Sequence, residues 1–392
     1  MPKSIYFVSF VVISAALIGG QLLRFSLFGF TLTALDIAVL AWAIFWLGGL
    51  LTRFRRYPTP RFLWWSIGFA CLAVVSLIGA LRFIGVPELV VASSYLIRWV
   101  AYALLVYLGY ALAKSSQLLP ALGLVFGLIA TLGILQWLIV PDLAFLERFG
   151  WDPHQGRLVS TFLDPNFVGG FLAIGVALAI PQFLTNKTTR LRWYWGVILL
   201  LSLVGIYLTF SRSALLALFA VIVIIGVLRY RLFSAALLIV VILSCAASPR
   251  WLERGKGAVT MDQTARYRIE SWVEGVNIMR HEPLIGVGFN TLPYTRANYG
   301  YPITGHSASG FDSSLLTVGV TTGGLGLLAY LGLLGSALLL AWKKWRRSSA
   351  PVALSFMAVT LALLVHSLFV NSLLYPSVLT VWWIILGLVW AI

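Results

Sequence analysis

Charge is scarce in this sequence. Charged residues make up 10% of its 392 residues, whereas hydrophobic residues make up 60%. Apolar runs of about 18 residues or more recur from one end of the chain to the other, long enough for helices to cross a bilayer. These runs do not alternate between apolar and polar residues, as the strands of a membrane β-barrel would. The sequence therefore predicts an all-α integral membrane protein.

Motifs that bind nucleotides or metals, or that carry a nucleophilic serine, are also missing. The chain has no glycine-rich phosphate loop leading into a helix, no closely spaced His/Cys cluster and no serine-centred nucleophile elbow. The four histidines are scattered, at positions 154, 281, 306 and 366. Cys71 and Cys245 both lie inside apolar runs, which argues against a disulfide framework. These absences predict a protein with no cofactor, no metal and no coupling to nucleotide hydrolysis.

The apolar runs predict about twelve transmembrane helices. Their ranges are 5–23, 31–51, 62–84, 89–112, 118–140, 159–183, 193–210, 213–228, 232–248, 313–341, 352–370 and 373–391. The first range follows Lys3 and lacks a small-residue cleavage site, so we expect it to be a span rather than a signal peptide.

The basic residues predict the orientation, because Lys and Arg are enriched in cytoplasmic loops. With the N-terminus inside, the inner loops contain no Asp or Glu, and every acidic residue falls on the outer side, counting Asp36 in the outer half of the second range. The inner basic residues are Arg53, Arg55, Arg56, Arg61, Lys114, Lys187, Arg190, Arg192, Arg229, Arg231, Lys343, Lys344, Arg346 and Arg347. We therefore expect both termini inside, and we attribute the net charge of +16 to topology rather than to nucleic-acid binding.

One long hydrophilic segment interrupts the apolar runs, from Pro249 to Asp312. It holds six of the twelve acidic residues and seven basic ones. Charged groups are costly in hydrocarbon, so this segment is expected outside the membrane. The predicted organisation is 1–248 with spans 1–9, a large extracytoplasmic catalytic loop with short helices at 249–312, and 313–392 with spans 10–12.

Arginines on the outer side are candidate ligands for an anion. Arg98 lies within the fourth range and Arg212 in the short link after the seventh, while Arg266 and Arg268 lie in TARYRIESW, where a surface helix is expected to begin. Each has a plainer interpretation: a snorkelling or paired arginine, an interfacial anchor, and a solvated helix face. A guanidinium is a planar fork of donors that suits phosphate. Several of them above an apolar bundle favour the diphosphate of a polyprenyl lipid as the ligand.

Glycosyl transfer from such a lipid needs a base that takes the proton of the acceptor hydroxyl. His306 and Asp312 lie at the end of the hydrophilic segment, and either could serve. His306 could instead be an ordinary polar loop residue. Asp312 could instead cap the helix that begins at SSLL.

Four ordered stretches resemble the O-antigen ligase and O-antigen polymerase superfamily. They are FLDPNFVGGFLA (162–173), TFSRSALLAL (209–218), RYRIESWVEGVNIMRHEPLIGVGFNTL (266–292) and DSSLLTVGVTTGGLGLLAYL (312–331). The resemblance covers roughly residues 150–340. It implies many spans, one large outer loop, and transfer of an undecaprenyl-diphosphate-linked glycan to a hydroxyl without a nucleotide donor or metal.

The resemblance also implies roles for single residues. Arg212, with Leu216, matches the family's Arg-x-x-x-Leu motif. Arg268, four residues before Trp272, matches the second arginine of the family, and Arg266 is the near alternative.

One position departs from the ligase pattern. Ligases have a histidine pair followed, after nine residues, by Gly-x-x-Gly. Alignment of Gly323 and Gly326 to those glycines places Asp312-Ser313 where the histidine pair would be, and His306 lies six residues earlier. An aspartate at this position resembles the polymerases of the superfamily.

The expected function is that of a metal-independent, inverting glycosyltransferase at the outer face of a bacterial cytoplasmic membrane. It would join lipid-linked repeat units into a surface polysaccharide. Arg212 and Arg268 would hold the diphosphate, helped by Arg98 or Arg266, and Asp312 or His306 would activate the acceptor. The donor is a glycan on undecaprenyl diphosphate, the acceptor is a glycan or a lipid carrier, and membrane lipids surround the protein.

Two other functions also fit these sequence features. An O-antigen ligase would use the same donor but transfer the finished glycan to a lipid A core or another carrier. A transporter or lipid flippase would share the layout of twelve spans with both termini inside, but it should show charged or broken-helix sites near the bilayer midplane.

Overall fold

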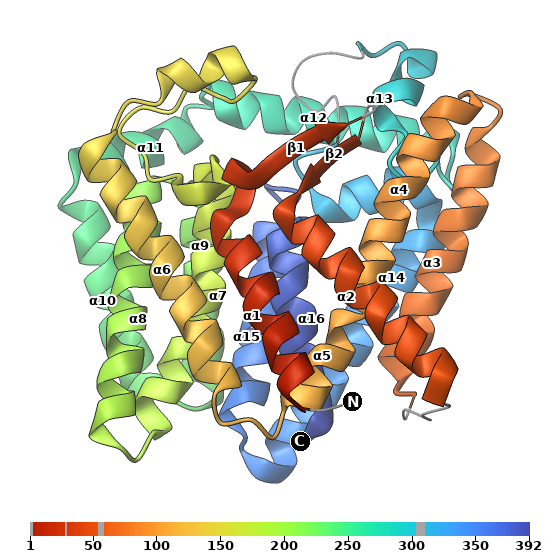
Figure 1. Ribbon diagram of the computed structural model, residues 1–392. Helices are drawn as coiled ribbons and strands as arrows, with labels where there is room; N and C mark the ends of the chain where they lie inside the picture. Colours follow the sequence, from red (N-terminus) through yellow and green to blue (C-terminus); the bar gives the residue numbers. More distant parts are fainter. Residues whose placement is uncertain (1–2, 28–29, 54–58, 303–309) are drawn as a thin grey trace.

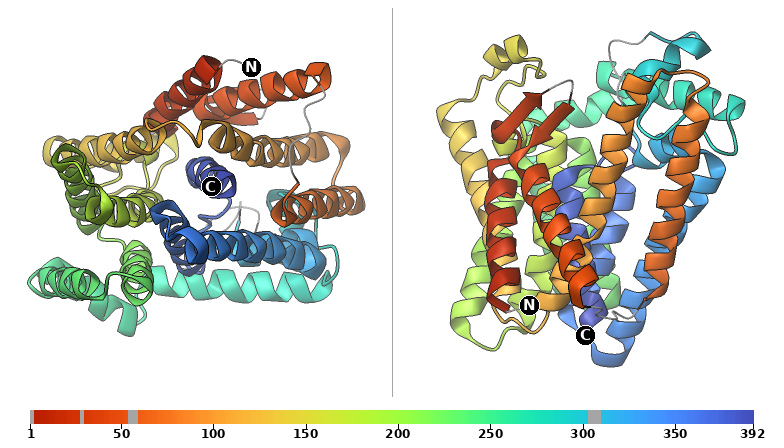
Figure 2. Two further views of the ribbon diagram at one scale, coloured as in Figure 1. Left: turned by 90° about the horizontal axis from the view of Figure 1, so that it is seen from below. Right: turned by 45° about the vertical axis from the view of Figure 1, so that its right-hand side comes forward.

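The computed structural model describes residues 3–27, 30–53, 59–302 and 310–392. Long helices form a bundle, and both chain ends lie at the same end of it (Figures 1 and 2). The bundle helices are α1 (Lys3–Gly19), α2 (Ala34–Arg53), α3 (Arg61–Ala80), α4 (Val86–Ala103), α5 (Leu105–Leu112), α6 (Leu118–Ile139), α7 (Pro165–Thr185), α8 (Thr189–Thr209), α9 (Arg212–Leu228), α10 (Arg231–Ala246), α14 (Ser314–Ser348), α15 (Pro351–His366) and α16 (Pro376–Ala391).

The opposite end of the bundle carries shorter elements, and we call it the cap end (Figure 1). Its elements are α11 (Pro249–Val259), α12 (Gln263–His281), α13 (Leu292–Thr295) and the antiparallel hairpin β1 (Arg24–Leu27) and β2 (Phe30–Thr33), with 3-10 turns η1 (Gly20–Leu23), η2 (Ala144–Phe149), η3 (Ser160–Phe162) and η4 (Arg296–Tyr299). The chain bends by 90° between α10 and the segment Pro249–His281. As a result, α12 lies across the bundle rather than along it (Figure 1).

Seven helical segments among the described residues are long and apolar enough to cross a membrane: Ser4–Leu23, Arg61–Ala80, Val86–Leu112, Leu118–Ile139, Pro165–Thr185, Thr189–Thr209 and Ser314–Ser348. The bent pair that begins with α10 would add an eighth. Four shorter apolar helices complete the bundle: Ala34–Gly49, Arg212–Leu228, Pro351–His366 and Pro376–Ala391. The chain is therefore an all-α integral membrane protein, and each of the twelve predicted apolar ranges contains a helix.

Several helix boundaries differ from the predicted ranges, among them those of the second, sixth and tenth ranges. The second range, 31–51, begins with β2, and helix starts only at Ala34. The sixth range, 159–183, opens with η3; its helix starts at Pro165, because the Asp164 carboxylate accepts the N–H groups of the first turn. The tenth range, 313–341, continues as helix to Ser348. In the sixth range, Val159 and Phe162 are apolar because they are buried in the turn before α7, not because they belong to a span.

The centre of the bundle is formed by α7, α15 and α16, and every residue of α16 from Ser377 to Trp390 is buried. Small residues allow close helix packing here. A Cβ atom on Gly109 of α5 would lie 2.1 Å from the carbonyl oxygen of Ile384, and one on Gly387 would lie 2.1 Å from that of Val106. The backbones of α5 and α16 thus touch directly, which is typical of helix pairs in membranes.

Helix α14 is broken at Gly323, whose backbone has φ 68° and ψ −176°. The turn segment 283–288 packs against the break and replaces the missing helical hydrogen bonds. The N–H groups of Val287 and Gly288 donate to the carbonyls of Val320 and Thr321, and the N–H of Gly324 donates to Pro283. The third and fourth stretches that resemble the superfamily, which are separated in sequence, are therefore hydrogen-bonded to each other.

Candidate active site

The first and second of these stretches meet at the cap end. Phe210 ends α8 with a positive φ of 48°, and Ser211 caps α9 by accepting the N–H of Ala214. The Ser211 hydroxyl also donates to Oδ1 of Asn166, at 2.7 Å. These local bonds fix the backbone immediately before Arg212, so this arginine lies at the first turn of α9 in a defined position.

Arg212 is held by groups from the hydrophilic segment. Its Nη2 donates to Asp262 Oδ1 at 2.9 Å, and its Nη1 donates to the backbone carbonyl of Arg254 at 3.2 Å. Asp262 also caps α12 by accepting the N–H of Ala265. Burial would raise the pKa of the Asp262 carboxyl, but the hydrogen bonds from Arg212 and Ala265 outweigh burial and hold the pKa below its ordinary value.

The α11 arginines contact the loop between α6 and α7. Arg250 donates from Nη1 to the carbonyl of Gly156 at 2.5 Å and from Nη2 to that of Gln155 at 2.6 Å. Arg254 donates from Nε to the carbonyl of Phe210 at 3.3 Å. Burial, followed by the positive charge of Arg212, lowers the pKa of Arg254.

Arg157 is a member of this site that the sequence analysis missed. Its Nε donates to the carbonyl of Thr209 at 2.8 Å, whereas its buried Nη2 has no hydrogen-bond partner among the described residues. Burial and then the charge of Arg254 lower the pKa of Arg157 to about 10. The sequence signal was an arginine flanked by turn residues in the outer loop HQGRLVS, but only the fold brings that loop to α9 and α11.

Arg268 and Arg266 have different surroundings in the structure. Arg268 is half-buried, its guanidinium lies 5.8 Å from the ring centroid of Phe369, and it interacts electrostatically with Asp312. Burial is the main cause that lowers the pKa of Arg268, with the charges of Arg212 and Arg254 contributing. Arg266 is exposed and donates from Nε to the carbonyl of Met261. Of Arg266 and Arg268, only Arg268 interacts with the other arginines.

Asp312 lies beside α12 just before α14. Its N–H donates to the Ser271 hydroxyl at 3.1 Å, and Trp272 Nε1 donates to its carbonyl at 3.4 Å. The cap of α14 is Ser313, which accepts the N–H of Leu316. The interpretation of Asp312 as the helix cap is therefore wrong. The other candidate base, His306, falls outside the residues that the structure describes.

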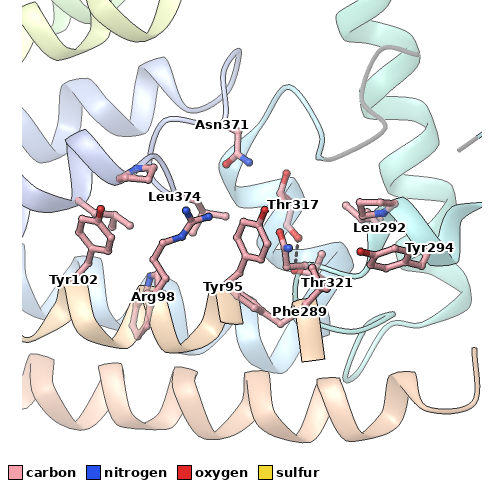
Figure 3. A pocket seen from close by; sticks show the side chains of 16 residues that line it. Tyr95, Arg98, Tyr102, Phe289, Leu292, Tyr294, Thr317, Thr321, Asn371 and Leu374 are labelled. Carbon is pink, nitrogen blue, oxygen red and sulfur yellow. Dashed lines mark hydrogen bonds between the residues drawn. The ribbon is translucent and has the colours of Figure 1, made fainter. Parts of the chain in front are cut away.

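Arg98 occupies a different environment. It pairs with Asp36, Nη1 to Oδ2 at 3.1 Å, and its guanidinium lies 4.3 Å from the ring centroid of Tyr95. It lines a cavity of about 330 Å³ between α4 and α14 (Figure 3). The pairing agrees with the plainer interpretation of Arg98 as a paired arginine of the bundle.

We call Arg157, Arg212, Arg250, Arg254 and Arg268 the arginine cluster. They come from a loop, the start of α9, α11 and α12, and they act on one another electrostatically. The neighbouring carboxylates are Asp164, Glu253, Asp262 and Asp312, so the five arginines are still in excess. Such an excess of guanidinium groups suits a ligand with several anionic oxygens. No group of three or more His, Cys, Asp or Glu side chains placed to hold a metal ion occurs in the described parts of the chain.

A comparison with curated proteins found none that matches the chain. Residues 197–331 match the family described as O-Antigen ligase, and this range includes Arg212, α11, α12 and the break in α14. This part of the chain is therefore similar to the O-antigen ligase family, which supports an assignment to the O-antigen ligase/polymerase superfamily of membrane enzymes that process glycans.

Proposed function

We propose that the protein is a polysaccharide polymerase that transfers a glycan from undecaprenyl diphosphate to a hydroxyl of a second glycan. The observation that carries the proposal is the arginine cluster, in which side chains from four parts of the chain converge at one end of an apolar bundle. A polyprenyl diphosphate matches both features, because its tail is soluble in the bilayer and its head group carries several anionic oxygens.

In this mechanism Arg212 and Arg268 bind the diphosphate, with Arg157 and Arg254 beside them. The acceptor oxygen forms a bond to the anomeric carbon as the bond from that carbon to the diphosphate breaks. Negative charge develops on the departing diphosphate, and pre-placed guanidinium groups stabilise it. Arg266 and Arg98 have other surroundings, so we give them no part in this step.

The acceptor hydroxyl must lose its proton during the transfer, and Asp312 is our candidate for the base. Its electrostatic interaction with Arg268 supports a position next to the leaving group. Attack from the side opposite the diphosphate would invert the anomeric carbon. His306 is the other candidate for this role.

The aspartate also bears on the choice between polymerase and ligase. Asp312-Ser313 stands where the resemblance to ligases would place a histidine pair, which favours the polymerase reaction. A ligase that transfers the glycan to a lipid A core or another carrier is the second candidate.

An assay with purified protein tests the reaction. Undecaprenyl-diphosphate oligosaccharide is supplied with EDTA and without nucleotide, for the wild type, Asp312→Asn and His306→Ala. We expect a ladder of products from the wild type and from His306→Ala, and a rate lower by about 10²–10⁴-fold for Asp312→Asn, the usual contribution of a general base. Product formation only after addition of a separate carrier would contradict the polymerase and favour the ligase.

We further propose that the chain crosses the bacterial cytoplasmic membrane twelve times, with both termini in the cytoplasm and the cap end outside. Both termini lie at the end opposite the arginine cluster, as this orientation requires (Figure 1). Alkaline phosphatase, which is active only outside the cytoplasm, should be active when inserted after Gly300 and inactive when inserted after Asn186. The reverse pattern would contradict the orientation.

A further inference from the structure

The cavity beside Arg98 is distinct from the arginine cluster and has no role in the mechanism above. Its lining comes from α4, α14, the segment 289–294, the turn after α15 and the first turn of α16 (Figure 3). Its volume of about 330 Å³ lies at the lower end of the range of about 300–1,000 Å³ found for small-molecule sites. The cavity is therefore large enough for a small organic group but not for a long lipid.

The Asp312 segment is hydrogen-bonded both to a residue of the cavity lining and to α12. Thr317 lines the cavity, and its Oγ1 accepts the N–H of Phe311 at 3.1 Å. The next residue, Asp312, donates its N–H to Ser271 of α12. Residues 311–312 thus connect a wall of the cavity to the helix that carries Arg268.

Two buried polar atoms belong to residues of this lining and lack partners within the described residues. Trp99 is 3% exposed, and its Nε1 has no acceptor. Oδ1 of Asn371 is also buried and has no donor. Unpaired buried polar groups are costly and rare, so a site with both an unused donor and an unused acceptor indicates a ligand that can accept and donate.

The charges at the cavity cancel. The Asp36 carboxylate accepts the N–H and hydroxyl of Thr33, the Tyr102 hydroxyl and Nη1 of Arg98. Arg98 uses one nitrogen in this pair, and a guanidinium has five N–H donors. The remaining donors belong to a side chain that lines the cavity (Figure 3). A neutral ligand with hydroxyl groups suits this pair better than a second anion or a cation.

Aromatic side chains provide the rest of the recognition surface. Tyr95, Trp99, Phe289 and Tyr294 line the cavity. The C–H faces of a pyranose ring are apolar and pack against aromatic rings, while its hydroxyl groups both donate and accept hydrogen bonds. A sugar therefore satisfies the aromatic walls and the unpaired polar atoms together.

We propose that this cavity, which we call the acceptor pocket, binds a neutral sugar residue of the acceptor glycan. The proposal rests on the proposed glycosyltransferase function and adds the place of the second substrate. Bound there, the acceptor would lie next to the Asp312 segment, with the arginine cluster holding the donor across it. Arg98, Trp99 and Asn371 would determine which sugar is accepted.

Saturation-transfer NMR with the full-length protein in nanodiscs tests the pocket. The probes are the methyl glycosides of glucose, galactose and mannose, and methyl glucuronide as the charged counterpart. We expect transfer to at least one neutral glycoside and none to the glucuronide. Trp99→Phe, which keeps an aromatic ring but removes the N–H donor, and Asn371→Ser should each weaken binding by about 3–10-fold, the loss expected for one hydrogen bond. Asn186→Ser, at the opposite end of the bundle, is the matched control.

Binding of undecaprenyl diphosphate, measured on the same samples, separates the two proposals. Unchanged lipid binding in the pocket variants shows that they are folded and supports a separate acceptor site. Absence of transfer to every neutral glycoside in a wild type that binds the lipid overturns the pocket but not the donor site. Binding of the glucuronide alone, or equal binding in wild type and variants, also overturns it. Failure of the wild type to bind undecaprenyl diphosphate would instead count against the arginine cluster.

Discussion

The guanidinium groups of the arginine cluster use only part of their donors to hold themselves in place. Within the described residues, Arg157 and Arg254 each donate one hydrogen bond, from Nε to the carbonyls of Thr209 and Phe210, and Arg212 donates two. Since a guanidinium carries five N–H groups, the cluster is fixed by the protein but keeps donors for a ligand. This arrangement is suited to binding an anion without a large rearrangement of side chains.

Asp262 allows the contribution of the Arg212 ion pair to be measured. Asp262→Asn keeps a capping oxygen for α12 but removes the charge, so it should lower the thermal unfolding midpoint at neutral pH. The folded-state pKa of Asp262 lies below its ordinary value of 3.8, so the carboxylate stabilises the fold above that value and loses this effect as the pH falls through the lower one. The difference in midpoint between wild type and variant should thus be constant from about pH 7 to pH 5 and shrink below about pH 4.

The exposed Asp152 offers a control, since Asp152→Asn should leave the midpoint nearly unchanged at every pH. A difference between wild type and Asp262→Asn that grows on acidification would contradict the account of the ion pair.

At the scale of elements, the break in α14 joins the bundle to the cap end. The segment 283–288 donates and accepts backbone hydrogen bonds within the break, and α12 packs against the part of α14 before it. The break therefore fixes the position of residues 283–288, which directly follow α12, the helix that carries Arg268.

Gly323 is required at this break for two reasons. Its φ of 68° with ψ of −176° lies in a region open almost only to glycine, and a Cβ there would lie 2.1 Å from the carbonyl oxygen of Leu284. Gly323→Ala should destabilise the protein by at least about 1–3 kcal/mol, measured as a lower unfolding midpoint in detergent. Gly335→Ala, on the same helix with open space around it, should not. Equal midpoints for the two variants would refute the structural role of the break.

Helices were more predictable than turns. Each predicted apolar range contains a helix, because an uncharged run of this length has few other stable forms in a membrane. The hairpin β1–β2 was missed because its strands are only four residues each and border the first two apolar ranges. The break at Gly323 was missed because its backbone groups pair with residues 283–288, which are distant in sequence. Arg212 and Arg268 were named from the sequence, whereas Arg157 and Arg254 gain their positions only when the loop 155–157 packs against α11.

At the scale of the whole molecule, the two ends of the bundle differ in kind. One end carries both termini, and the other carries α11, the crossing helix α12 and the hairpin β1–β2 (Figures 1 and 2). The arginine cluster and the acceptor pocket lie toward the end that carries α12. This asymmetry is what an enzyme acting on a lipid head group at one membrane surface requires. The crossing segment from Ser248 onward is also the part of the chain that supplies Arg250, Arg254, Asp262 and Arg268.

The central claim is that the arginine cluster binds the diphosphate of the donor lipid, and α12 provides a matched pair of variants to test it. Both Arg268→Gln and Arg266→Gln remove one positive charge from the same helix, but only Arg268 faces the cluster. The affinity of each purified variant for undecaprenyl diphosphate is measured in nanodiscs. We predict that Arg268→Gln binds at least about 30-fold more weakly than the wild type, since loss of a partly buried charge partner costs about 2 kcal/mol or more, and that Arg266→Gln binds nearly as tightly as the wild type. Equal affinities for the two variants would contradict the account.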